Sequence, residues 1–320
     1  MKVVIPKELK AEMPPTMFGK ILSATPVVMA VVATMLAGLA SSEMTRAQYD
    51  RSLAAQQQSK AGDQWSFFQA KRMRGAFQRN TAELLQAVSA VRPFEATTLA
   101  QWSEGKPELA AMISSPDGQR ALGFLQRSEV PANSTAVAWD PKIQAALDGL
   151  EALRPDSDMA ALLAPVDVPS LEKALRAARD QVDALDTATK PINEAIDRMD
   201  ALVSRQAALS AGAGGGGGLS VNRDFTVARL RYTAVRYEVE ARLNQAIANL
   251  YELQVRKSNF SAERHHARSQ KFFFGMLGAQ LGVIVSTFAM AARNRNLLWS
   301  LAAAAGLLAI GFAVYVYLCV

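Results

Sequence analysis

The hydrophobic pattern of the chain is dominated by three stretches that contain no Asp, Glu, Lys, Arg or His. They occupy residues 21–42, 272–292 and 297–320. A helix needs about 20 apolar residues to cross a bilayer, and each stretch reaches that length. The first stretch is too long for the apolar core of a signal peptide, which has about 7 to 15 residues. The sequence therefore predicts three transmembrane helices, with the lipid bilayer as the first partner of the chain.

Two polar segments with helical character continue directly from these spans. Residues 43–91 contain no proline and are rich in good helix formers, and Pro93 follows them. Residues 221–271 contain neither proline nor glycine, and their apolar positions keep helical spacing: Val239, Leu243, Ala246, Leu250 and Leu253. The two segments are similar in length. We therefore expect an outgoing and a return helix that pair as a long antiparallel stalk.

The most regular helical pattern lies at 169–209. Apolar positions alternate there at spacings of 4 and 3, which is the heptad pattern of a helix that packs along a seam: Leu171, Leu175, Ala178, Val182, Leu185, Thr189, Ile192, Ile196, Met199 and Val203. Pro191 does not shift the phase, so we expect a kinked helix or two helices that meet near Thr189. We interpret the glycine-rich stretch 210–220 as a flexible linker, because no phosphate-loop GK[ST] follows it.

Residues 92–168 show a weaker pattern, because repeated prolines divide them into short pieces. Asp140 before Pro141 predicts one short helix that ends near Arg154. We expect a small, irregular helical cap here. A tail at 1–20 and a short basic link at 293–296 complete the chain. The expected fold class is an all-α membrane protein: three transmembrane helices with a long antiparallel helical stalk and a small helical cap.

The charge distribution argues against a nucleic-acid partner. The formal net charge is +6, but the excess is divided among the tail, the link at 293–296 and the long polar region. That region is close to balance, so it lacks the concentrated surplus of Lys and Arg that binds phosphates. Within it, basic residues collect near the spans and acidic residues in the middle.

Residue patterns for catalysis or metal binding are scarce. His265 and His266 are the only histidines. On a helix they lie about 100° apart, so they do not bind one metal ion from one face. The sequence contains no nucleophile elbow, zinc motif, Walker motif or dinucleotide fingerprint. The single cysteine, Cys319, forms no internal disulfide. We therefore expect neither an enzymatic activity nor a cofactor or metal site.

The stretch SKAGDQWSFFQAKRMR, at 59–74, combines aromatic and basic residues. Membrane interfaces and nucleic-acid sites also use this combination. Trp65, however, lies about 35 Å along a continuous helix from the first span, too far for a membrane belt. Ala61, Trp65, Phe68 and Arg72 share one helix face, at spacings of 4, 3 and 4. We therefore predict a surface for helix packing.

Two packing contacts follow from the expected hairpin. Counting back from the second span to the same distance from the membrane leads to 246–251. We therefore expect Trp65 and Phe68 beside the return helix, where Leu250 and Leu253 are the packing residues. In the second span, Gly278 and Gly282 form a GxxxG pair, which lets another helix approach closely. This pair is expected to pack on the first span or on a second copy.

These features resemble one known family. An uncharged span followed by SKAGDQWSFFQAKRMR is similar to the bacterial membrane proteins of the domain of unknown function 4337 family. ERHHARSQKFFF entering a span and RNRNLLW opening the next resemble that family's closing helical hairpin. The resemblance covers 20–91 and 222–320. The glycine linker and the proline-rich cap depart from it, and Phe67 and Phe68 stand where tyrosine is expected. Because the family has no established activity, the resemblance implies an architecture and no chemistry.

Two functions of different classes remain open. The first is a structural or protein-interaction protein, whose spans anchor a helical stalk that presents an acidic cap to an unknown protein partner, with a homo-oligomer as one form. The second is a subunit of a channel or ion-driven motor, which has the same order of one span, a helical domain and two spans. Ion carriers usually place a charged group within the membrane, and these spans contain none.

The orientation is predicted from the short segments next to the spans. Basic residues in short loops stay in the cytoplasm, whereas long domains cross largely regardless of charge. The tail at 1–20 and the link at 293–296 are both short and basic. We therefore expect a cytoplasmic N-terminus and an extracytoplasmic helical domain, in a bacterial inner (plasma) membrane.

Overall fold

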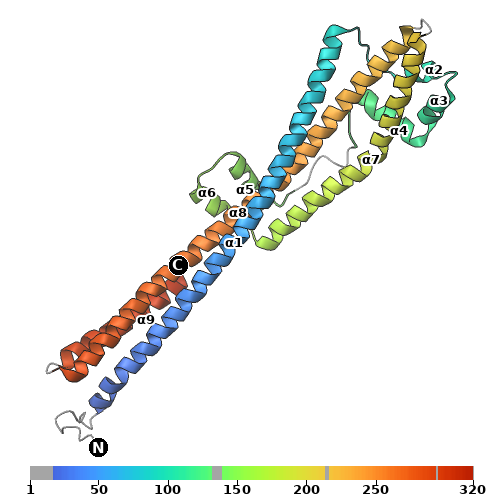
Figure 1. Ribbon diagram of the computed structural model, residues 1–320. Helices are drawn as coiled ribbons and strands as arrows, with labels where there is room; N and C mark the ends of the chain where they lie inside the picture. Colours follow the sequence, from blue (N-terminus) through green and yellow to red (C-terminus); the bar gives the residue numbers. More distant parts are fainter. Residues whose placement is uncertain (1–16, 132–138, 213–215, 293–294, 320) are drawn as a thin grey trace, which may run out of the picture. The chain divides into compact units, whose positions relative to one another are not determined.

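The structure, a computed structural model, describes residues 17–131, 139–212, 216–292 and 295–319. Every regular element in these ranges is an α-helix, as the sequence predicts (Figure 1). The helices are α1 (Met17–Val88), α2 (Ala96–Trp102), α3 (Pro107–Ser114), α4 (Pro116–Arg127), α5 (Pro141–Glu151), α6 (Asp156–Leu163), α7 (Val168–Gly212), α8 (Gly216–Ala291) and α9 (Arg295–Cys319). Most of the predicted tail at 1–20, and part of the link at 293–296, lie outside the described residues.

Three of the described helices are long and apolar enough to cross a membrane. They are α1, α8 and α9, which contain the three uncharged stretches of the sequence. The all-α fold with three long apolar helices is therefore confirmed.

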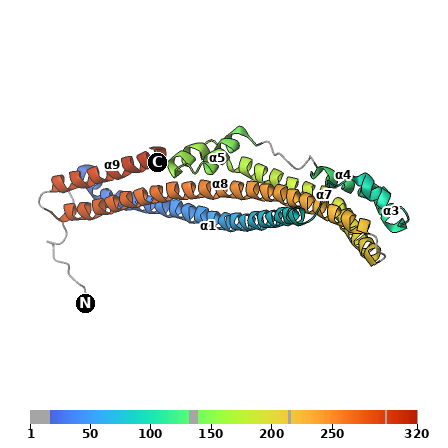
Figure 2. The same cartoon turned by 90° about the horizontal axis from the view of Figure 1, so that it is seen from above.

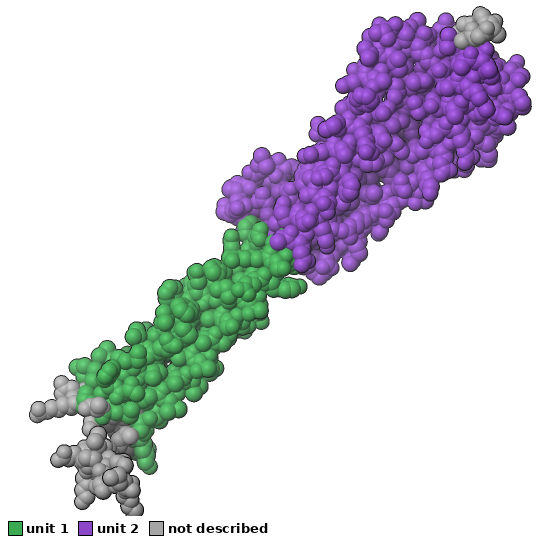
Figure 3. All heavy atoms as spheres, viewed as in Figure 1, with its two compact units in different colours: residues 1–54, 257–320 green, residues 55–256 purple. Residues whose placement is uncertain are grey.

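The chain forms two compact units (Figure 3). Unit 1 consists of residues 1–54 and 257–320, and unit 2 consists of residues 55–256. The long helices α1 and α8 contribute residues to both units. Each unit has a buried apolar core of its own.

Unit 1 contains the first part of α1, the last part of α8 and α9. In both views α9 lies beside the end of α8 (Figures 1 and 2). The core consists of small and medium-sized apolar side chains: Met29, Ala33, Leu36, Ala40, Phe272, Ala279, Ala309 and Val316. α1 and α8 are antiparallel here, because Leu36 approaches Gly275 whereas Met29, earlier in α1, approaches Gly282.

Met29 connects all three helices of unit 1. Its side chain is buried. A Cβ atom on Gly282 of α8 would lie 2.4 Å from the Met29 Cε, and one on Gly306 of α9 would lie 2.5 Å from the Met29 Sδ. Met29 fits only because neither glycine has a side chain. The flexible, unbranched methionine is well suited to such a narrow space.

Side-chain hydrogen bonds also connect the helices of unit 1. The Ser269 Oγ donates to the carbonyl oxygen of Ala40 over 2.7 Å. The Trp299 Nε1 donates to the Thr25 Oγ1 over 2.9 Å. Hydrogen bonds between membrane helices contribute about 0.6 kcal/mol on average, so they fix the register of α1 against α8 and α9 more than they stabilise the bundle.

The outside of unit 1 is covered by large apolar side chains. They include Val27, Val28, Val31, Met35, Leu281, Ile284, Phe288, Leu301, Leu307 and Leu308, all exposed. Soluble monomers rarely expose contiguous apolar patches larger than a few hundred Å². This surface matches the chemistry of a bilayer interior.

In unit 2, α1 and α8 form the predicted antiparallel pair. Trp65 contacts Glu252, whereas Arg79, later in α1, contacts Glu238, earlier in α8. The long helices run side by side in both views (Figures 1 and 2).

The heptad pattern of α7 predicts its buried face. Nine of its ten seam positions are buried, and Val182 is half-buried. α7 is one continuous helix that includes Pro191, so two helices do not meet near Thr189. The C-terminal half of the seam packs in one core with α2, α3, α4 and α8.

The glycine-rich stretch differs from the expected linker. α7 extends to Gly212 and α8 begins at Gly216, so helix covers much of 210–220. The reason is close packing of the two helix ends. A Cβ atom on Gly218 would lie 3.1 Å from the Ser210 Cβ and 3.3 Å from the Ala207 Cα. Gly218 thus permits close contact between α7 and α8.

The expected single cap consists of two separate groups of helices. The α2–α4 group packs on α7 and α8, around Leu109, Leu122 and Phe225. The α5–α6 hairpin instead bonds to a later part of α8, where the Arg256 Nη1 donates to the Asp156 Oδ1 over 2.7 Å. Asp140 caps α5 as predicted, since its side chain accepts from the backbone N–H of Lys142. The sequence gives no indication of which long helix each short helix contacts.

Candidate functional site

The stretch 59–74 lies on α1 against α8, as predicted. The Trp65 Nε1 donates to the Glu252 Oε1 over 2.6 Å, one residue beyond the range expected from counting. The Trp65 and Phe68 rings meet edge to face, with centroids 5.4 Å apart. Both side chains are half-buried. The aromatic pair therefore lies at the edge of the helix contact.

Leu250 and Leu253 are fully buried in the same part of α8. Their burial involves more than the contact with α1. The Asn249 Nδ2 donates to the Glu151 Oε1 of α5 over 3.4 Å. Arg179 of α7 donates to the hydroxyl of Tyr251 and lies over its ring. Helices α1, α5 and α7 thus all contact α8 around these leucines.

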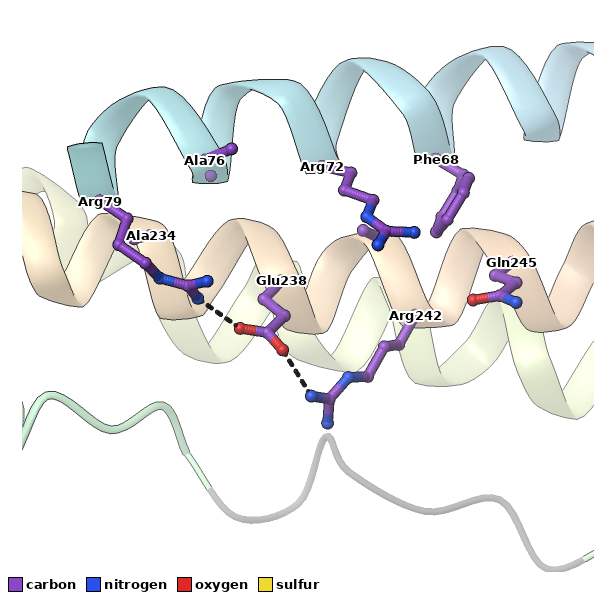
Figure 4. Close-up of a pocket in the computed structure, with 10 residues that line it drawn as sticks. Phe68, Arg72, Ala76, Arg79, Ala234, Glu238, Arg242 and Gln245 are labelled. Carbon is purple, nitrogen blue, oxygen red and sulfur yellow. Dashed lines mark hydrogen bonds and ion pairs between the residues drawn. The ribbon is translucent and has the colours of Figure 1, made fainter. Parts of the chain in front are cut away.

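Beyond Phe68, the contact between α1 and α8 becomes charged. Lys71 pairs with Glu240. The Arg79 Nη2 donates to Glu238 over 2.8 Å, and the Arg242 Nη2 donates to the other oxygen of the same carboxylate over 2.6 Å. Figure 4 shows Glu238 between the two guanidinium groups. The pairs made by Lys71 and Arg79 join α1 to α8, whereas the Arg242–Glu238 pair lies within α8.

A groove of about 460 Å³ lies along this part of the contact. Its lining residues come from α1 and α8: Phe68, Arg72, Gly75, Ala76, Arg79, Ala234, Glu238, Ala241, Arg242 and Gln245 (Figure 4). The groove exists because its floor consists of small residues. A Cβ atom on Gly75 would lie 3.3 Å from the carbonyl oxygen of Ala234, so the two backbones nearly touch.

The groove is cationic. Three arginines and one glutamate line it. Arg79 and Arg242 share Glu238, and the Arg72 guanidinium lies 5.8 Å from the centroid of the Phe68 ring. The hydrogen bond from Arg242 lowers the pKa of Glu238; partial burial acts in the opposite direction, and Arg79 adds to the lowering. The carboxylate therefore stays ionised well into the acidic range.

We expect acid to weaken unit 2 partly through Glu238. A carboxyl group whose pKa is lowered in the folded state stabilises the fold above its unfolded-state pKa, about 4, and this contribution is lost as the pH falls through the lower, folded-state pKa. Glu238→Gln should therefore flatten the dependence of the unfolding midpoint on pH below about pH 5. Glu194→Gln is the control, because Glu194 lies 3.9 Å from Arg198 in an exposed pair. If the unfolding midpoint falls equally steeply with pH in Glu238→Gln and in the unchanged protein, Glu238 does not have this role.

The two glycines of the predicted pair have different surroundings in the structure. Gly282 lies against Met29 of α1, which agrees with the expected packing on the first span. A Cβ atom on Gly278 would have no atom within 4 Å. The sequence did not single out Gly306, which completes the space for Met29. Its place in an alanine-rich stretch of α9 was the available signal.

Substitution of the two glycines should therefore have unequal effects. Gly282→Val displaces Met29, which Gly306 confines from the other side, and overpacking of this kind costs about 1 to 3 kcal/mol. Gly278→Val should change stability little. The unfolding midpoint in detergent measures both. Equal destabilisation by the two substitutions would show that Met29 does not set the packing of unit 1.

The two histidines have different partners. The His265 Nδ1 lies 2.5 Å from the Glu43 Oε2, and both side chains are largely buried. The His266 Nε2 lies 3.0 Å from the Gln270 Nε2. Within the described residues, no group of three or more His, Cys, Asp or Glu side chains is arranged to hold a metal ion.

The sequence around α1 matches a known family. Residues 18–113 match the family model described as Domain of unknown function (DUF4337). This part of the chain is therefore similar to that family. No curated protein and no solved structure matches the chain.

The DUF4337 region contains α1, α2 and most of α3. It therefore includes the stretch 59–74 and one wall of the groove, with Arg72 and Arg79. The opposite wall, with Glu238 and Arg242, belongs to α8, outside the matched residues. The part of the resemblance at 222–320 also lies outside the match. The DUF4337 match extends beyond 91, into the first helices of the region that the sequence assigned to the cap.

The groove is not predictable from the sequence pattern of either helix alone. Glu238 and Arg242 are four residues apart on α8, a spacing that places them together on one helix face. The pattern of α1 alone does not show that Arg79 reaches the same carboxylate. That contact depends on the register between helices that are far apart in the sequence.

Proposed function

We propose that this protein is a membrane-anchored helical scaffold that binds a protein partner through the cationic groove between α1 and α8. The observation that carries the proposal is the groove itself, which is lined by three arginines and a single carboxylate (Figure 4). Arginine presents a planar fork of donors that matches carboxylate geometry. The partner is therefore expected to offer an acidic segment.

Membrane anchoring is supported by the chemistry of unit 1. Three helices of sufficient length, with apolar side chains on their outer faces, favour insertion in a bilayer. The bacterial inner (plasma) membrane is the proposed location. In unit 2 we propose that α7 and α8 pack as a coiled coil along the heptad seam of α7.

The binding function is tested by photocrosslinking from the groove in living cells. A photoreactive residue at Gln245 should give an adduct with a partner protein. Arg72→Glu combined with Arg242→Glu should reduce that adduct at least tenfold, because both reversals repel an acidic segment. Arg198→Glu, on α7 and outside the groove, is the matched control and should leave the adduct unchanged. No adduct, or one that persists after both reversals, would exclude the groove as the binding site.

A subunit of a channel or ion-driven motor is the alternative class. Its support is the order of the spans alone. Ion flux in liposomes that contain the purified protein distinguishes the two classes, since a scaffold conducts no ions.

The proposed orientation places the N-terminus in the cytoplasm and unit 2 outside it. Three spans then put the C-terminus on the extracytoplasmic side. Alkaline phosphatase fused after the last residue should therefore be active, because it folds only outside the cytoplasm. Bright fluorescence of a green fluorescent protein fused at the same place would reverse the orientation.

A further inference from the structure

α1 carries an uncharged stripe on the face that points away from α8. Within unit 2, seven positions follow one another on this face at alternating spacings of 4 and 3, the spacing of a heptad seam. We call them the α1 stripe: Ser66, Ala70, Met73, Phe77, Asn80, Leu84 and Ala87. All seven are exposed. The stripe therefore has the pattern of a packing surface without a partner in the described chain.

The stripe lies opposite the contact with α8. Gly75 and Ala82 are buried against α8. At about 100° per residue, Phe77 and Leu84 lie about 160° around the helix from these positions. Figure 4 shows Phe68 and Arg79 pointing toward α8. The stripe residues lie on the opposite side of α1. The groove and the stripe are thus separate surfaces.

Charged residues are frequent on this part of α1, but none belongs to the stripe. They are Lys71, Arg72, Arg74, Arg79 and Glu83. A solvated helix face normally carries such residues, while a face that packs does not. Their exclusion from seven consecutive seam positions indicates that the stripe is covered in the working protein.

The exposed apolar area is large enough for an interface. Met73, Phe77 and Leu84, with Phe67 and Val88 at the borders, are 55% to 73% exposed. With about 150 to 200 Å² for a large side chain, they offer on the order of 600 Å² of apolar surface. A stable dimer of standard size buries about 800 Å² on each partner. The stripe supplies most of that area.

We propose that the α1 stripe binds the α1 stripe of a second copy of this chain, as a parallel two-stranded coiled coil. The proposal deepens the scaffold function and rests on its membrane anchoring. Two copies in one membrane insert in the same sense, so their stripes run parallel and begin at the same sequence distance from the first span. A twofold axis between them then brings each stripe residue next to its own copy.

The charges of the stripe and its borders fit this self-association. A charged residue in the stripe would meet a like charge across the twofold axis, and the stripe contains none. In the heptad, Phe77 and Leu84 take core positions, and Gln69 and Arg74 take the flanking g and e positions that approach each other in a parallel pair. Gln69 therefore meets Arg74 of the second copy without repulsion.

Asn80 adds a reason for one register. A single asparagine at an a position of a coiled coil specifies register and number of strands, at a cost in stability, and Asn80 takes the other core position, d. In a parallel pair, Asn80 faces its own copy, and the two amides satisfy each other by hydrogen bonds. A shift by one heptad would place the amide against Met73 or Ala87, both apolar.

Disulfide crosslinking tests the proposal in native membranes. In a Cys319→Ser background, Leu84→Cys and Gln86→Cys form a matched pair: both positions are exposed and lie two residues apart, and only Leu84 belongs to the stripe. A disulfide needs Cα atoms within about 4.4 to 6.8 Å, which facing core positions meet. Oxidation should yield at least ten times more dimer from Leu84→Cys than from Gln86→Cys. Equal yields, or none, would overturn the proposal.

A second measurement does not depend on cysteines. Phe77→Glu with Leu84→Glu places like charges across the twofold axis and should convert the dimer to a monomer, read as mass in detergent by light scattering. Because both side chains are exposed, helicity by circular dichroism should stay unchanged. A dimer that survives these substitutions, or one that forms through the spans alone, refutes the stripe as the interface. Carbonate extraction distinguishes failure of the anchoring from failure of the interface. Release of the protein from the membrane would contradict the anchoring. Retention in the membrane without disulfide crosslinks would contradict only the interface.

Discussion

Replacement of Gly118 by alanine is expected to open the α2–α4 group of helices. A Cβ atom on Gly118 would lie 2.0 Å from the carbonyl oxygen of Met112 and 2.9 Å from the Ser115 Oγ. A backbone oxygen does not move aside as a flexible side chain does, so α3 and α4 must separate. The change also disturbs Ser115, which caps α4 by accepting from the N–H of Gly118 over 3.0 Å. We expect a cost of about 3 kcal/mol, the upper end of overpacking.

Amide hydrogen exchange of α2–α4 measures this effect. A loss of about 3 kcal/mol in local stability accelerates exchange by roughly a hundredfold. Gly123→Ala, on the same helix, is the control, because its Cβ would meet only the Arg127 side chain, at 3.7 Å. Alanine should stabilise the helix there, by up to about 1 kcal/mol. Similar exchange in both variants would show that α3 and α4 are not packed as described.

Tyr232→Ala is expected to destabilise unit 2 by about 3 to 5 kcal/mol, the usual cost of deleting a large buried side chain. Tyr232 is 1% exposed and belongs to the core that joins α7 and α8 to the α2–α4 group. The same core contains Ile192, Ile196 and Met199 of the α7 seam. Denaturant unfolding followed by circular dichroism gives the change in free energy.

Tyr232→Phe separates the ring from its hydroxyl. The hydroxyl donates to the Asn193 Oδ1 over 3.3 Å, a long hydrogen bond, so its loss should cost only about 1 kcal/mol. Burial raises the pKa of Tyr232 to about 12. A raised pKa stabilises the fold below the unfolded-state value, about 10, and the contribution is lost as the pH rises toward 12. Tyr232→Phe should therefore lose no stability through this group as the pH rises from 10 to 12. If Tyr232→Phe were as unstable as Tyr232→Ala, the ring would not be the main stabilising part of the side chain.

Regular spacing allowed a large part of the fold to be predicted. The heptad positions of α7, from Leu171 to Val203, are the buried ones because a period of 3.5 residues keeps one face toward a partner. The charge-free stretches located the three apolar helices. Counting from the spans placed Trp65 within one residue of its contact, Glu252, because both long helices have a constant rise.

Contacts between helices of different regions were not predictable in this way. Gly278 and Gly282 have the same sequence signature, and only the rotation of α8 decides that Gly282 alone approaches Met29. The shared carboxylate of Glu238 depends likewise on the register of α1 against α8. Propensity and periodicity describe one helix at a time, whereas these contacts are set by two.

The antiparallel pairing of α1 with α8 also determines the order of events during synthesis. Trp65 and Glu252 are 187 residues apart. At about 5 to 20 residues per second, α1 waits roughly 10 to 40 s for its partner. The fully buried positions on its side of the contact are small residues, Ala61, Gly75 and Ala82. The large buried side chains of Leu250 and Leu253 are synthesised after α1, α5 and α7, the helices that contact α8 around them.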